Sequence, residues 1–167
     1  MAATFQLVLL IGLSSGLLMG ADARCRKKGG CKHECMGCPD GWTIKENRCY
    51  RFEADKKEWC DAEKHCIAQG GNLASIHDAG ELHFIRGMID RVSEKKTAAW
   101  LGGTDAIKEG CWMWSDGSSC DFKYWGKNQP SKKKRQDCML LGINGVNNIR
   151  CNVKAAFVCT RDVEPRE

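Results

Sequence analysis

Beyond residue 23 the sequence has no apolar run long enough to cross a bilayer, no internal repeat and no recognisable nucleic-acid-binding motif. The formal net charge of +5 is a modest basic excess, which is common in secreted proteins and does not by itself indicate a nucleic-acid partner. We therefore expect no membrane span in the mature chain and no nucleic acid as a partner. What remains after residue 23 is the length of a single domain.

The residue patterns of hydrolytic enzymes are also missing. No Ser, His and Asp residues stand out in the order of a catalytic triad, and no paired-carboxylate motif is present. A secreted phospholipase A2 would need a His-Asp pair beside a Gly-rich calcium loop, and His65, which precedes Cys66, has no such loop. We expect no enzymatic activity.

The N-terminal segment has the features of a secretory signal. Residues 5–19 are apolar, and small residues follow up to Ala23, as a signal-peptidase site prefers. The run is short and interrupted by Gly and Ser, which favours a signal over residues 1–23 and leaves a retained membrane anchor as the alternative. The protein is therefore predicted to be secreted and extracellular.

Twelve cysteines are present, and all of them follow residue 23. An even, dense set in a secreted chain is typical of a disulfide framework. Zinc is the alternative for residues 31–38, which contain three cysteines and His33. A second ligand pair at zinc spacing is missing and the compartment is oxidising, so disulfides are the favoured interpretation.

Composition divides the mature chain into three parts. Residues 24–37 are rich in Gly, Lys and Cys and nearly without apolar residues, which predicts an extension held by disulfides rather than a core. Residues 38–160 carry the patterns of a folded domain, and residues 161–167 form a polar tail.

The domain is predicted to be α+β. Hydrophobic spacing predicts helices over residues 55–69, capped by Asp55 and stopped by Gly70 and Gly71, and over about 78–92. Short strands are predicted around these helices at residues 42–44, 49–52, 74–76, 138–142, 147–152 and 155–159. The chain from Trp100 onward is Gly- and Trp-rich, with long loops. Two helices followed by irregular β structure are typical of an α+β fold.

Several motifs, in this order, resemble those of the C-type lectin-like domain: CPDGW (38–42), CY (49–50), the helix carrying Cys66, GGNLASI (70–76), WLGG (100–103), WMWSDGS (112–118), Gln-Pro-Ser (129–131) and the three last cysteines. The resemblance covers roughly residues 38–159, which is most of the mature chain. Short secreted members of that family, such as fish lectins and type II antifreeze proteins, share this organisation. The four tryptophans at positions 100, 112, 114 and 125 match packing positions of the family more than ligand-stacking positions.

The resemblance implies three disulfides, namely Cys38–Cys49, Cys66–Cys159 and Cys138–Cys151. A local disulfide between Cys111 and Cys120, which flank residues 112–119, is also predicted. The sequence leaves four partners unassigned: Cys25, Cys31, Cys35 and Cys60. Cys60 could tether the basic extension. The alternative is an interchain bond through one of these cysteines or through Cys111, which would make a disulfide-linked homodimer.

Sugar-binding members of the family hold a calcium ion in the long loop. The resemblance places the corresponding ligand positions at Gln129, Ser131, Gln136, Asn147 and Asn148. All five side chains are neutral, and the nearest carboxylate, Asp137, is one position out of register. Calcium prefers carboxylate oxygens, so we expect a degenerate carbohydrate site that has lost its calcium and needs no cofactor.

Four consecutive cations lie between these positions: Lys132, Lys133, Lys134 and Arg135. Each would oppose a nearby metal ion by about 1 kcal/mol even at water-like dielectric. The run is either a solvated loop or protease-sensitive site, or it binds an anionic extracellular ligand such as a sulfated or phosphorylated glycan, an anionic lipid or an acidic partner. The predicted function is calcium-independent carbohydrate recognition by a secreted lectin-like protein. Ice binding of the type II antifreeze kind and binding of a protein partner are the alternatives.

Overall fold

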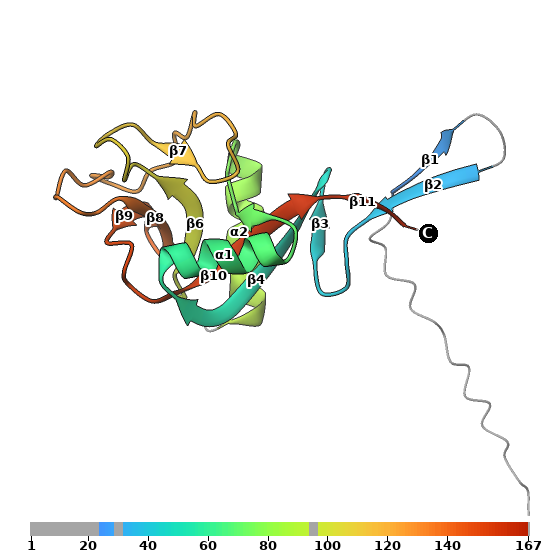
Figure 1. Cartoon of the computed structure of the whole chain (residues 1–167), viewed down its shortest axis with the longest axis horizontal. Helices are drawn as coiled ribbons and strands as arrows, with labels where there is room; N and C mark the ends of the chain where they lie inside the picture. The colour runs from blue at the N-terminus through green and yellow to red at the C-terminus, as the bar shows by residue number, and fades with distance from the viewer. Residues whose placement is uncertain (1–23, 29–31, 94–96, 167) are drawn as a thin grey trace, which may run out of the picture.

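The computed structural model describes residues 24–28, 32–93 and 97–166, so the predicted signal segment lies outside the described residues (Figure 1). In the described part of the chain no helix is long and apolar enough to span a membrane. Two helices, α1 (Trp59–Ala68) and α2 (Ala79–Val92), accompany the strands, which confirms the α+β prediction. The strands are β1 (Arg24–Lys28), β2 (Lys32–Gly37), β3 (Thr43–Lys45), β4 (Arg48–Lys57), β5 (Asn72–Leu73), β6 (Ala99–Thr104), β7 (Met113–Trp114), β8 (Cys138–Gly142), β9 (Gly145–Ile149), β10 (Ala155–Asp162) and β11 (Glu164–Arg166).

The main sheet follows the order β3-β4-β10-β6-β8-β9, with β5 added at β10 and β7 at β6. The β10–β6 pair is parallel and the other pairs are antiparallel. β10 is the central strand, and its residues from Ala155 to Thr160 are all buried. Trp100 on β6 is fully buried, and its indole N–H donates to the Lys57 carbonyl oxygen at 2.9 Å. Burying such a large side chain anchors the β6–β10 contact that supports the loops described below.

The first helix begins later than predicted. β4 continues to Lys57, where it pairs with Ala155 of β10, so Asp55 lies in a strand and does not cap the helix. Sheet pairing overrides the local helical spacing there. The second helix agrees with the predicted range, and at its start Asp78 Oδ1 accepts a hydrogen bond from the Glu81 N–H at 2.7 Å. Residues 74–76 form no strand, although the Ala74 N–H bonds the Val158 carbonyl oxygen at 2.8 Å.

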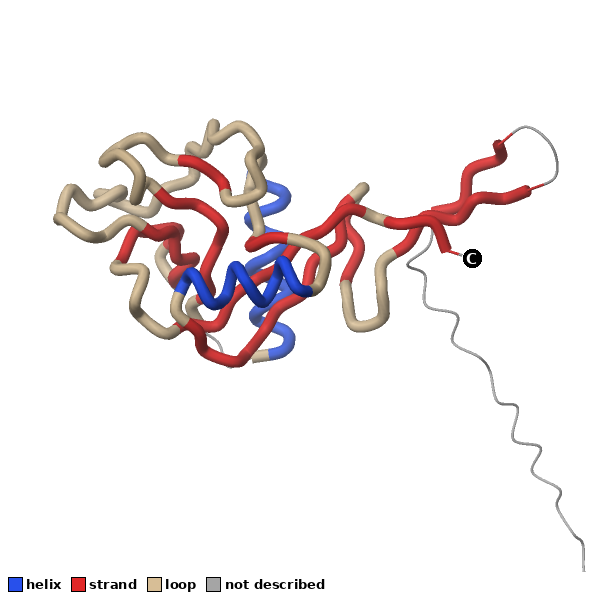
Figure 2. The backbone as a smooth tube through the Cα atoms, in the orientation of Figure 1, coloured by secondary structure: helices blue, strands red, loops and turns tan. Residues whose placement is uncertain are grey.

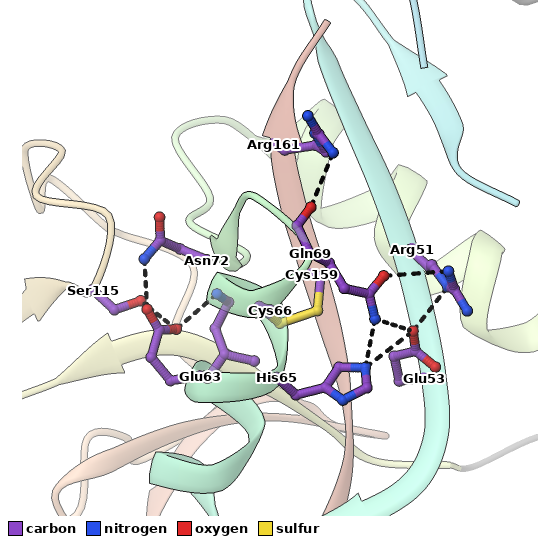
Figure 3. The surroundings of a disulfide bond; sticks show 11 residues. Arg51, Glu53, Glu63, His65, Cys66, Gln69, Asn72, Ser115, Cys159 and Arg161 are labelled. Atoms are coloured by element: carbon purple, nitrogen blue, oxygen red, sulfur yellow. Dashed lines mark hydrogen bonds and ion pairs between the residues drawn. A yellow bond between two sulfur atoms is a disulfide. The ribbon is translucent and has the colours of Figure 1, made fainter. Parts of the chain in front are cut away.

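The three disulfides implied by the resemblance are present: Cys38–Cys49, Cys66–Cys159 and Cys138–Cys151. Figure 3 shows that Cys66 on α1 is bonded to Cys159 on β10, beside the Glu63 carboxylate. Glu63 accepts hydrogen bonds from Asn72 Nδ2 at 2.6 Å and from Ser115 Oγ at 3.0 Å. The disulfide and the buried carboxylate together tie α1 to the sheet and to the loop that follows β7.

The predicted Cys111–Cys120 disulfide is wrong for this structure, in which both residues are free cysteines. Cys120 is half-buried against the aromatic core, whereas Cys111 is exposed. Burial raises the pKa of the Cys120 thiol, and the nearby Cys111 adds to the rise, so the two thiols are neighbours without a bond between them. Cys60 is also free and exposed, so it does not tether the extension, and Cys35 is disulfide-bonded.

The extension and the tail fold together. β1, β2 and β11 form a separate sheet in that order, with Pro165 of β11 opposite Met36 of β2. Figure 2 shows this small sheet projecting away from the main body of the molecule. In the described part of the predicted tail, β10 runs to Asp162 and β11 spans Glu164–Arg166. Composition missed this pairing because backbone hydrogen bonds depend little on side-chain type.

Candidate functional site

The long loop leaves the sheet beside β9. Trp125 bridges to Val146, and the Gly126 N–H donates to the Val146 carbonyl oxygen at 2.8 Å. A Cβ at Gly126 would lie 2.9 Å from the Asn144 carbonyl oxygen, so this close approach requires glycine. The chain then passes through the predicted site positions and returns to the sheet at β8.

Asn148 holds both ends of the segment that carries the four cations. It lies on β9 with only 3% of its surface exposed. Its Oδ1 accepts from the Ser131 N–H at 2.6 Å, and its Nδ2 donates to the carbonyl oxygens of Ser131 at 2.9 Å and Gln136 at 2.6 Å. Both amide protons and one oxygen lone pair are therefore used by the loop backbone.

The other predicted positions are arranged differently. Two side-chain oxygens, Gln129 Oε1 and Asn147 Oδ1, are buried and have no hydrogen-bond partner in the described structure. The Asn147 oxygen lies against Gly142, where an added Cβ would be 3.2 Å from it. The structure thus joins Ser131, Gln136 and Asn148 through hydrogen bonds and leaves Gln129 and Asn147 outside that network. All five side chains are neutral.

A groove of about 870 Å³ lies beside this loop. Its walls combine an aromatic ring and a proline with amide, hydroxyl and charged side chains, from Asp105, Glu109, Gly110, Trp112, Gln129, Pro130, Ser131, Lys132, Lys134 and Asn148. Trp112 is half-buried and is held edge-to-face by Trp125, with ring centroids 4.9 Å apart. Sequence reasoning assigned Trp112 to packing only, because no motif shows which face of a loop tryptophan remains open.

The four cations divide into two pairs. All are exposed, but Lys132 and Lys134 line the groove, whereas Lys133 and Arg135 are not among its lining residues. None of the four lies within ion-pair distance of a carboxylate in the described part of the chain. Their charge is therefore available to an external ligand.

The floor of the groove contains a buried carboxylate that sequence reasoning did not single out. Asp105 is 3% exposed, and its Oδ2 accepts from the Gly110 N–H at 2.8 Å. Its Oδ1 has no partner among the described residues. Burial raises the pKa of the Asp105 carboxyl, the Gly110 N–H opposes this effect, and the negative charge of Asp137 adds to the rise.

Replacing Asp105 with Asn is expected to raise the melting temperature at pH 7 by about a few degrees. The folded-state pKa lies above the unfolded one, so the carboxylate costs stability above the folded pKa and costs nothing below about pH 3.9. The gain should therefore shrink as the pH falls through this window. Thermal unfolding of both proteins between about pH 3.5 and about pH 7 measures the difference in melting temperature. Asp61→Asn, at an exposed position on α1, is the control, and a lower melting temperature for Asp105→Asn at pH 7 would contradict the prediction.

A second polar cluster brings Ser118, His77 and Asp121 together in space. Ser118 Oγ lies 3.3 Å from His77 Nε2, but it donates to Asp116 Oδ1 at 2.6 Å. His77 Nδ1 is 3.8 Å from Asp121 Oδ1, which is too long for a hydrogen bond. Burial alone would raise the pKa of Asp116, yet hydrogen bonds from Ser118 and Ser75 lower it. This cluster lacks the nucleophile–base–carboxylate chain of a triad, because the serine proton is directed to Asp116.

Comparisons with known proteins agree with this architecture. The family model described as Lectin C-type domain matches residues 55–161. The galactose-specific lectin nattectin of Thalassophryne nattereri is 37% identical over 166 residues, covering 98% of this chain and all of that protein. Ladderlectin of Oncorhynchus mykiss is 35% identical over 132 residues, covering 76% of this chain and 70% of that protein.

Two solved structures have a similar fold. A calcium-independent type II antifreeze protein superimposes with a TM-score of 0.70 at 29% identity, covering 77% of this chain and 97% of that chain. Human lithostathine superimposes with a TM-score of 0.71 at 30% identity, covering 75% and 91% of the two chains.

Proposed function

Because this chain belongs to the C-type lectin domain family, we propose that it is a secreted protein that binds carbohydrate without calcium. The observation that carries the proposal is the groove in which Trp112 and Pro130 face amide, hydroxyl and ammonium groups of the long loop. Ligand grooves combine apolar walls with a few polar groups in this way. The proposed ligand is an anionic glycan.

The aromatic wall supports a sugar as the ligand class. A sugar ring has an apolar C–H face that packs on an aromatic ring, while its hydroxyls bond amides and hydroxyls at the edges. Trp112 is fixed by Trp125, so little side-chain freedom is lost when a ligand packs against it. Galactose is named for nattectin, which spans the whole of this chain's fold, and this supports carbohydrate as the ligand class here.

The chemistry of the loop supports binding without calcium. Calcium takes six to eight oxygens and prefers carboxylates, whereas the five aligned positions offer neutral groups only. Asn148 already uses its amide on the loop backbone. The residues present do not fit the ion, and the nearby Lys132 and Lys134 oppose it further. The structural likeness to an antifreeze protein described as calcium-independent is consistent with this proposal.

The unpaired cations support an anionic glycan over a neutral one, although the carboxylates of Glu109 and the buried Asp105 line the same groove. Lys132 and Lys134 line the groove and have no carboxylate partner in the described structure, so a sulfate or phosphate group could approach both ammonium groups. Such contacts weaken with salt, because the Debye length is about 8 Å at physiological ionic strength.

Binding to a sulfated glycan is expected to depend on Trp112 and on the two groove lysines. On a heparin column, Trp112→Ala should weaken binding by about tenfold, and Lys132→Gln with Lys134→Gln should elute at clearly lower salt. Retention of the unaltered protein should be equal in calcium and in chelator. A glycan array run under both conditions then identifies the preferred glycan.

The matched control is Lys133→Gln with Arg135→Gln, which removes the same charge from the same run outside the groove. If both double variants elute at the same salt, the run acts only as diffuse charge. Retention that disappears in chelator, or micromolar calcium uptake by calorimetry, would sink the calcium-independent proposal.

Ice binding is the second candidate, because type II antifreeze proteins superimpose on most of this chain. Ice-binding faces are poor in charge, and the exposed run from Lys132 to Arg135 is unfavourable for that use. A thermal-hysteresis measurement on the purified protein tests it.

Binding of a protein partner as a disulfide-linked homodimer would use an exposed free thiol such as Cys60 or Cys111, and a non-reducing gel tests that arrangement.

A further inference from the structure

We propose that the Arg135–Gln136 peptide bond is a cleavage site for a trypsin-like protease that prefers consecutive basic residues. Cleavage would open the segment that forms one wall of the groove while the chain stays in one covalent piece. The effect on glycan binding rests on the proposed function, whereas the cleavage itself does not.

The segment before this bond is accessible. Residues 132–135 are exposed and lie outside the helices and strands. Exposed loops are the preferred places for proteolytic nicking. Arginine directly before the bond suits the aspartate at the bottom of a trypsin-like specificity pocket, and the three preceding lysines suit further acidic subsites. These cations have no ion-pair partner in the described part of the chain that a protease would need to displace.

Asn148 is the side chain that holds both ends of this segment, within which the Lys133 N–H also donates to Ser131 Oγ at 3.3 Å. Asn148 bonds the backbone of Ser131 before the cations and the carbonyl oxygen of Gln136 after them. A protease must bind several residues in an extended conformation, so these bonds must break first. When opening is fast relative to cleavage, the cleavage rate follows the population of the open state. Asn148 therefore limits the rate of cleavage.

Hydrolysis adds the oxygen of water to the Arg135 carbonyl carbon, breaks its bond to nitrogen and leaves Gln136 with a free amine. Cys38–Cys49 lies wholly before the cut and Cys138–Cys151 wholly after it. Cys66–Cys159 has one sulfur on each side, so the two pieces remain joined. The product keeps its core, but Lys132 and Lys134 are then on a free chain end and no longer on a closed loop.

The test is limited digestion of the full mature protein with trypsin at a low enzyme ratio, followed by gel electrophoresis and mass spectrometry. One band without reductant and two fragments with reductant, meeting between Arg135 and Gln136, are expected before any other cut. Replacing all four cations with Gln should slow this first cut by at least about tenfold, since the specificity pocket needs a cation. Arg150→Gln, at another exposed arginine, should leave it unchanged.

Asn148→Ala should speed the cut by about thirtyfold or more, because the open state becomes more populated. A first cut at another basic residue, or an unchanged rate in the four-Gln variant, would overturn the cleavage site. Heparin retention is then compared before and after the cut. Cleavage is expected to weaken heparin binding. If the intact protein binds and the cut protein elutes at the same salt, this expected effect on glycan binding is overturned. If the intact protein does not bind at all, the proposed function fails, and the mass data still decide the cleavage site.

Discussion

Replacing Cys66 and Cys159 together with alanine is expected to lower the free energy of unfolding by about 4–5 kcal/mol. The bond closes a separation of 93 residues, and both sulfurs are fully buried between α1 and β10 (Figure 3). Without it, the unfolded chain gains the conformational freedom of that long loop. A loss of this size is a large part of the stability of a small domain. Urea unfolding at about 25 °C, with comparison of midpoints and slopes, measures the loss of unfolding free energy.

Two further variants separate loop closure from the mere loss of a thiol. Replacing Cys138 and Cys151, which are 13 residues apart, should cost less, about 3 kcal/mol. Replacing the exposed free Cys60 should cost about 0.5 kcal/mol or less. An equal loss for the long and the short bridge would show that local packing, and not loop closure, dominates.

Asn148→Ala is expected to destabilise the long loop by about 2–4 kcal/mol and to abolish the groove beside it. The substitution leaves the Ser131 N–H and the carbonyl oxygens of Ser131 and Gln136 without their partner. Unsatisfied backbone groups are costly when buried, so the loop should open to water. Hydrogen exchange of the Ser131 amide should accelerate, while the amides of β10 remain protected.

Asn147→Ala is the matched control for this prediction. It removes the same side chain one residue away on β9, but the Asn147 oxygen has no hydrogen-bond partner to lose. We expect a change of about 0.5 kcal/mol or less in loop stability. Equal effects of the two substitutions would contradict the role assigned to Asn148.

Much of the framework follows from local patterns. The hydrophobic spacing of residues 79–92 predicts α2 correctly, because amphipathic spacing is a short-range property. The start of α1 was predicted too early, because the pairing of Lys57 with Ala155 depends on residues far apart in the chain. The pairing of β11 with β2 was missed for the same reason.

Some features of the candidate site, like those of the framework, can be predicted from the sequence, and others cannot. The neutral chemistry at Gln129, Ser131 and Gln136 and the charge of the loop are visible in the sequence. The sequence cannot show that Asn148 uses its amide on the loop backbone, that Trp112 forms a groove wall, or that Asp105 is buried below it. These facts depend on side-chain direction and burial, which require the packed structure.

By itself, the sequence determined the neutral character of the loop and the run of four cations, and the family resemblance carried by its motifs implied the three disulfide pairs. Only the tertiary structure decided that Lys132 and Lys134 line the groove while Lys133 and Arg135 do not, and that Cys111 and Cys120 remain free. The physical reason is the range of the interactions. Charge and ligand type belong to each residue, whereas the grouping of residues 105, 112, 130 and 148 around one groove results from packing between distant segments.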